Sequence, residues 1–234
     1  MVSVTACFII LASFGIFSLF NKFLEFGVVP IPKRYVGNLQ YKWRSAVVSL
    51  LHSSVVGSMS IYSVPTIWSD FVLNYTSIGE TTVAIFTGYM IYDIINLLIR
   101  NVNYSNVVAS LIIHHVMGCF FGVIMIHHQQ WLGYGILCLV SNEINIIFTH
   151  IRQLMLMNDV PKSSTIFRVN NMLFIVSFVT IRAPAYLIIL VLLVQDVQRM
   201  TAIWHFSMIP GSAGLLLLNL YMFVKLLSSD YFVV

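Results

Sequence analysis

Ionisable side chains recur at matching positions in four successive apolar segments of the chain. They are His52, Asp93, the adjacent pair His114 and His115, and Glu143. An ionised side chain in hydrocarbon costs about 2.5–3.5 kcal/mol on insertion scales, so it persists only beside a partner or in a polar cavity. Imidazoles and buried carboxylates are also the groups that exchange protons near neutral pH. The pattern predicts an interior polar site for acid–base chemistry or for binding a polar group.

The segments that carry these residues are long enough to cross a bilayer. The chain of 234 residues is 59% hydrophobic and 9% charged, whereas a soluble domain carries about 25% charged residues. A spanning helix needs about 20 mostly apolar residues. We therefore predict an all-α integral membrane protein with seven spans. The spans are residues 2–20, 46–64, 82–99, 108–126, 132–149, 171–194 and 204–226. The first lacks a basic leading region and a small-residue cleavage site, which favours a retained helix over a cleaved signal peptide.

The distribution of Lys and Arg predicts the orientation of these spans. Ten of the 12 basic residues fall in segments on one side of the membrane, Arg199 falls on the other, and Arg182 lies inside a span. Basic residues favour the cytosolic side, so we expect the N-terminus outside and the C-terminus in the cytosol. The net charge of +4 then reflects attraction to anionic inner-leaflet lipids rather than nucleic-acid binding. The sequon at Asn74 is predicted to be external and open to glycosylation, and that at Asn103 to be cytosolic and silent.

This orientation brings the polar residues to one depth. His52 is the seventh residue of its span counted from the cytosol, and the histidine pair lies six and seven residues into the fourth span. Asp93 and Glu143 each lie six residues before a cytosolic end. At 1.5 Å per residue, all of them lie roughly 9–11 Å below the cytosolic boundary. We expect their side chains to converge on a cavity, with His52 binding substrate and the other four as catalytic candidates.

Three further residues are candidates for substrate binding. Asn145 follows Glu143 by two positions, Asn219 lies at the same depth in the last span, and Arg182 lies deeper, two residues before Pro184. The proline is expected to kink its helix and free a carbonyl near the arginine. Arg182 can serve either as a counter-ion for one of the two carboxylates or as an anion-binding group.

Other titratable residues receive structural interpretations. His52 itself has the alternative of a hydrogen bond to a neighbouring helix. The three cysteines have no metal-ligand spacing, so no metal site is predicted. The remaining histidines lie at predicted span ends and are assigned to the membrane interface: His127, His128, His150 and His205.

Seven short strings occur in order along the chain. They are Trp43-Arg44, Ser49 to Ser53, Gly88 to Asp93, His114 to Met117, Glu143 to Arg152, Phe167 to Asn170, and Arg182 to Pro184. Together they resemble the TLC-domain family, which includes the ceramide synthases and a set of smaller TLC-domain-containing proteins. The resemblance covers about residues 40–228 and is closest to the small members that set plasma-membrane lipid composition.

The resemblance implies a six-helix TLC barrel over residues 40–228. The N-terminal helix and basic cytosolic linker of residues 1–39 are expected outside that core. In ceramide synthases the paired histidines transfer an acyl group from acyl-CoA to a long-chain base, and His114 and His115 match them. Those enzymes carry a pair of aspartates after the histidines, where this chain has Glu143 and Asn145.

Three functions follow as hypotheses. The first is a plasma-membrane regulator that limits incorporation of polyunsaturated, fluidising acyl chains into phospholipids and so favours a rigid membrane, with the endoplasmic reticulum as the alternative location. The second is an integral acyltransferase in which a histidine accepts a proton from an amine or hydroxyl nucleophile. The third is a proton-linked lipid transporter. The expected partners are membrane lipids or acyl chains. No cofactor is expected, and acyl-CoA enters only as a substrate of the second hypothesis.

Overall fold

The computed structural model describes residues 3–27, 31, 40–100, 106–199 and 202–231, and its regular structure is helical throughout these ranges. The predicted linker residues Lys33 and Arg34, and the sequon at Asn103, lie outside the described residues. The helices are α1 (Val4–Glu25), α2 (Gln40–Ile67), α3 (Ser77–Arg100), α4 (Asn106–His128), α5 (Leu132–Met157), α6 (Thr165–Ser177), η2 (Phe178–Arg182), α7 (Ala183–Gln195), η3 (Val197–Arg199) and α8 (Ala202–Tyr231).

Six helical runs in the described part of the chain are long and apolar enough to cross a membrane, with Thr165–Gln195 counted as one run. The predicted all-α membrane architecture is confirmed to this extent. The seventh predicted span, residues 204–226, falls in α8. The apolar stretch described there is Phe206–Tyr221, which is shorter than the roughly 20 residues that a full crossing needs.

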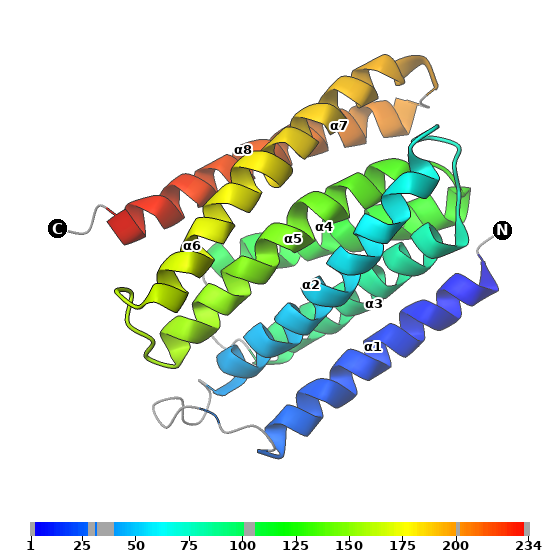
Figure 1. The fold of residues 1–234 in the computed structure, drawn as a ribbon. Helices are drawn as coiled ribbons and strands as arrows, with labels where there is room; N and C mark the ends of the chain where they lie inside the picture. Colours follow the sequence, from blue (N-terminus) through cyan, green and yellow to red (C-terminus); the bar gives the residue numbers. More distant parts are fainter. Residues whose placement is uncertain (1–2, 28–30, 32–39, 101–105, 200–201, 232–234) are drawn as a thin grey trace.

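The long helices lie side by side in one bundle, with α1 at one edge and α6, α7 and α8 at the other (Figure 1). The closest helix pairs are α2 with α5, α1 with α3, and α3 with α4. Apolar side chains fill the space between them, and Val56, Val83, Ile126 and Ile136 are almost completely buried in the largest cluster. The packing of helices α2 to α5 therefore positions the polar residues.

Helix α1, which the resemblance places outside the six-helix core, packs closely against α3. Phe17 is 5% exposed and packs in a cluster with Tyr89 of α3. The two helices approach closely at Gly88, where an added Cβ would overlap the carbonyl oxygen of Ile10 and lie 2.7 Å from the Ser13 Cβ. The Ser13 hydroxyl donates a hydrogen bond of 2.9 Å to the Ile85 carbonyl. Small residues allow this contact between backbones, as is common in membrane helix pairs.

Replacing Gly88 with leucine is expected to force α1 away from α3. Overpacking of a filled interior costs about 1–3 kcal/mol, and the first obstacle here is backbone, which cannot rotate aside. Gly15 is the matched control on α1, because an added Cβ there has nothing within 4 Å. Thermal unfolding of the purified protein in detergent should show a lower midpoint for Gly88→Leu than for Gly15→Leu. Equal midpoints would contradict the close packing.

The helix that contains Arg182 is irregular just before Pro184, as the proline predicts. Residues Phe178–Arg182 form a π-helix, and Pro184 follows within the first turn of α7. Proline lacks a backbone N–H, and its ring clashes with the carbonyl group one turn before it. A π-bulge in the preceding turn is one way for the helix to continue past the proline. The bulge rotates α6 relative to α7 and sets the direction of Arg182.

Two ion pairs and a hydrogen bond, together called the clasp, join the loops at the end of the bundle that is predicted to be external. Arg199 forms ion pairs with Asp70 at 2.8 Å and Asp196 at 3.1 Å, and the Tyr134 hydroxyl donates to Asp196 at 2.7 Å. The hydrogen bond from Arg199 holds the pKa of the Asp70 carboxyl below its usual value. The loop after α2 is thereby tied to the loop after α7.

The clasp predicts a pH dependence of stability. Since the pKa of Asp70 is lower in the folded chain than in the unfolded one, its contribution is complete above the unfolded pKa of 3.8. The contribution is lost as the pH falls through the folded pKa. The effect should be small because both side chains are partly exposed. Unfolding midpoints at pH 7 and pH 3 should differ less for Asp70→Asn than for the unchanged protein, and an equal difference would contradict the pairing.

Candidate functional site

The first half of the site is a histidine held by a carboxylate between α3 and α4. Nδ1 of His115 lies 3.2 Å from Oδ2 of Asp93, and the two side chains are 9% and 6% exposed. The atoms are within ion-pair distance, although their angles do not meet those of a hydrogen bond. A carboxylate beside an imidazole fixes the ring and stabilises its protonated form, which is what a general base requires.

The second half is a similar pair between α2 and α5. Nδ1 of His52 lies 3.6 Å from Oε2 of Glu143, and these side chains are 2% and 4% exposed. Tyr89 stacks on the His52 ring with centroids 3.6 Å apart, and its hydroxyl shares a hydrogen bond of 2.8 Å with Ser49. The edge of Phe17 meets the same imidazole at 5.8 Å. Aromatic side chains on both sides hold His52 in place.

These two pairs, His115 with Asp93 and His52 with Glu143, form the histidine cluster. The expected convergence of both pairs on one cavity stays a prediction. His115 is the member of the histidine pair that meets a carboxylate. The His114 ring lies 5.7 Å from that of His115 and is partly buried.

His150 lies further along α5, which continues to Met157, beyond the predicted span end at residue 149. It follows Glu143 by seven residues, and two helical turns return to the same face of the helix. Its assignment to the membrane interface stays a prediction.

Three predicted substrate-binding residues bind one another. Arg182 donates from Nη1 to the Asn145 amide oxygen at 2.9 Å and from Nη2 to that of Asn219 at 2.6 Å. Asn145 also donates to the Phe174 carbonyl at 2.9 Å. Arg182 thus joins α5 to α8 through amide oxygens rather than through a carboxylate, while Glu143 lies within electrostatic range. Any role of the three in substrate binding stays a prediction.

Several buried polar atoms have no hydrogen-bond partner. A buried polar atom left unpaired costs about 1–3 kcal/mol, and native proteins keep few of them except where a site needs them. In the described part of the chain three of these atoms belong to the two pairs: Nε2 of His52, Nδ1 of His115 and Oε2 of Glu143. Others lie on Trp43, Arg44, Ser60, Tyr75, Glu80, His150 and Arg182. The three atoms in the two pairs favour a site there that takes a polar group.

Comparison with known proteins agrees with this arrangement of helices and motifs. The family model of the TLC domain matches residues 42–228. The chain belongs to the TLC-domain family. It is 29% identical over 230 residues to TLC domain-containing protein 2 of Danio rerio, covering 94% of this chain and 88% of the relative. It is 30% identical over 200 residues to TLC domain-containing protein 1 of Gallus gallus, covering 82% and 75%. No solved structure matches.

The family resemblance predicted from the short strings is confirmed, and the protein is a multi-pass membrane protein with a TLC domain. The polar cluster is built from α2, α3, α4 and α5, all within the TLC domain. Phe17 comes from α1, which precedes the matched residues. The helix before the TLC domain therefore contributes one wall around His52.

Proposed function

We propose that this TLC-domain protein regulates phospholipid composition at the plasma membrane. It limits the incorporation of polyunsaturated acyl chains and so favours a rigid membrane. The observation that carries the proposal is the pair of buried histidine–carboxylate contacts, His115 with Asp93 and His52 with Glu143. They lie in helices that are long and apolar enough to cross a membrane, where lipids and acyl chains surround the protein.

A second function, acyl transfer, is favoured by the contact between His115 and Asp93. In that reaction the His115 imidazole takes a proton from a hydroxyl or amine, and the freed lone pair attacks the thioester carbonyl of acyl-CoA. The carbon–sulfur bond breaks, and the proton passes to the departing thiolate. Asp93 stabilises the imidazolium between these steps. Proton-linked lipid transport ranks third, because the charged cluster occupies one half of the bundle and only Arg182 lies deeper.

Lipid analysis of cells tests the proposal. Cells that lack the protein should show a higher polyunsaturated fraction in their phospholipids when polyunsaturated fatty acids are supplied, and their membranes should be more fluid. Reintroducing the intact protein should reverse both changes. An unchanged phospholipid profile on loss of the protein would reject the regulatory function. Incubation of the purified protein with acyl-CoA and lysophospholipid separates regulation from turnover, because only the acyltransferase releases free coenzyme A.

We also propose that α8 provides a seventh span, with the N-terminus outside and the C-terminus in the cytosol. On this topology Asn74 is glycosylated. Its side chain is partly exposed in the loop between α2 and α3, where Nδ2 donates to the Ser69 hydroxyl at 2.7 Å. Glycosidase treatment should increase gel mobility of the unchanged protein but not of Asn74→Gln. A C-terminal tag accessible to antibody on intact cells would refute the topology.

A further inference from the structure

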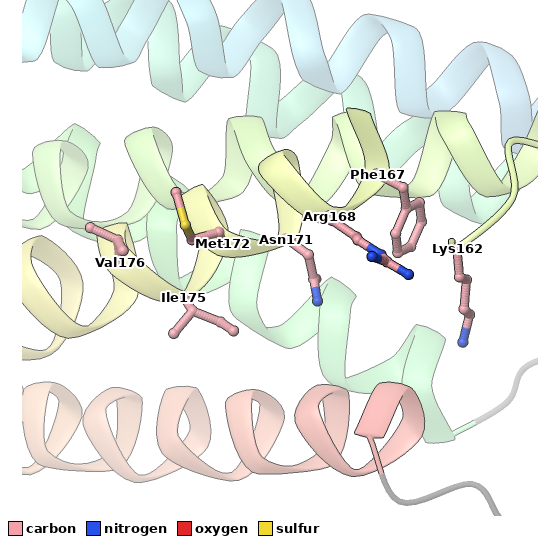
Figure 2. A pocket seen from close by; sticks show the side chains of 7 residues that line it. All are labelled: Lys162, Phe167, Arg168, Asn171, Met172, Ile175 and Val176. Atoms are coloured by element: carbon pink, nitrogen blue, oxygen red, sulfur yellow. The ribbon is translucent and has the colours of Figure 1, made fainter. Parts of the chain in front are cut away.

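A groove separate from the histidine cluster runs along α6. It has a volume of about 410 Å³, and its lining consists of Lys162, Phe167, Arg168, Asn171, Met172, Ile175 and Val176. Figure 2 shows these side chains along α6, with Asn171 and Ile175 directed towards α8, drawn in pale red. The groove therefore lies on the side of α6 that faces the last helix.

The lining changes from polar to apolar along the helix. Arg168, Asn171, Met172 and Ile175 are spaced i, i+3, i+4 and i+7, which places them on one face. Arg168 lies in the first turn of α6, and Ile175 lies about 10 Å further along it. A phospholipid has the same order, because its charged headgroup lies at the membrane surface and its acyl chains lie deeper.

Positive charge surrounds the polar end of the groove. Arg168 is exposed, and none of the ion pairs among the described residues gives it a carboxylate. Lys162 is also exposed, and Arg152 lies over the Phe167 ring at 5.7 Å from its centroid. Asp159 is the acidic residue of the loop between α5 and α6. A guanidinium binds phosphate with two parallel hydrogen bonds, which makes arginine well matched to a lipid phosphate.

We propose that this groove binds one anionic phospholipid of the leaflet at the start of α6. Its phosphate contacts Arg168 and Lys162, and the upper part of an acyl chain lies on Met172, Ile175 and Val176. The bias of basic residues assigns this end to the cytosolic side, whose leaflet holds the anionic lipids. The site is independent of the histidine cluster and does not rest on the function proposed for it.

Native mass spectrometry of the purified full chain in detergent tests the proposal. The probes are dioleoyl phosphatidylserine and dioleoyl phosphatidylcholine, which share acyl chains and differ in net charge. The unchanged protein should bind phosphatidylserine more tightly. Arg168→Gln should weaken phosphatidylserine binding about tenfold, as expected for loss of a charged hydrogen bond. It should weaken phosphatidylcholine binding less, because the choline ammonium already offsets the charge of that phosphate. Equal binding of both lipids, or an unchanged affinity in Arg168→Gln, would overturn the proposal.

Two controls keep the result specific. Lys42→Gln removes an exposed basic residue of α2 outside the groove lining and should bind phosphatidylserine like the unchanged protein. An equal loss in Lys42→Gln would show general charge attraction and reject the groove. Glycerophosphoserine, the same headgroup without acyl chains, should compete poorly. If it binds as tightly as the lipid, the apolar half contributes nothing, and the groove is a plain anion site.

Discussion

Replacing His115 with alanine is expected to abolish the effect of this protein on phospholipid composition while the protein still reaches the membrane. His115 is buried, and its Nδ1 lies 3.2 Å from the Asp93 carboxylate. Removing a general base lowers a reaction rate by about 10²–10⁴-fold, so residual turnover would be negligible in cells. The double variant His114→Ala/His115→Ala should behave in the same way. His114→Ala alone should be milder, because no carboxylate among the described residues lies at ion-pair distance from His114.

The matched control is His127→Ala, which removes an exposed histidine from the far end of the same helix and should restore lipid composition fully. Asp93→Asn keeps the shape of the side chain and removes its charge, so it tests the pair without opening a cavity. Lipid profiles should be compared at equal amounts of membrane protein. A stably expressed double histidine variant that restores composition would show the histidines to be structural, and both the enzyme and the polar-site interpretations would fall.

Removing one member of the pair between His52 and Glu143 is expected to destabilise the protein strongly. In His52→Ala the buried Glu143 carboxyl loses the imidazole that lies 3.6 Å away, and leaving a buried polar group without its partner costs about 1–3 kcal/mol. The variant also loses the stacking of Tyr89 on the imidazole. The midpoint of thermal unfolding in detergent should fall well below that of the unchanged protein.

Replacing both partners separates stability from function. In His52→Phe/Glu143→Met no buried polar group is left without a partner, and replacing both partners by apolar groups of similar shape can be nearly neutral or stabilising. The unfolding midpoint of the double variant should therefore recover towards that of the unchanged protein. If the pair belongs to the functional site, lipid composition should not recover with it. If the double variant recovers both the unfolding midpoint and the lipid composition, the pair contributes to packing alone.

Depth in the membrane was predictable for the polar residues, but the choice of partner was not. Counting residues along a helix gives depth directly, because each residue rises 1.5 Å. Which residue His115 meets depends on how each helix is rotated about its axis. That rotation follows from close packing between helices, as at Gly88 against Ile10 and Ser13, and such packing involves residues far apart in the chain.

The same reason applies to Arg182 and to the end of α5. The sequence left Arg182 as a counter-ion or an anion-binding group, and the structure gives its guanidinium hydrogen bonds to Asn145 and Asn219. Hydropathy ended the fifth span at residue 149, whereas α5 continues to Met157 because a helix continues as long as its backbone hydrogen bonds are made. In each case a local pattern placed the residue, and the surrounding helices decided its contacts.

The sequence alone was enough to establish that the protein is helical and lies in a membrane and that its motifs are those of a TLC domain, and it predicts that its titratable residues share one depth. Each of these depends on composition, on spacing along one helix or on the order of short strings, and all three are local properties. Only the tertiary structure decided that His115 pairs with Asp93 and His52 with Glu143, that α1 supplies Phe17 to the site, and that Arg199 reaches Asp70. These contacts join residues from different helices and loops, and they form only when the helices pack with one particular set of rotations.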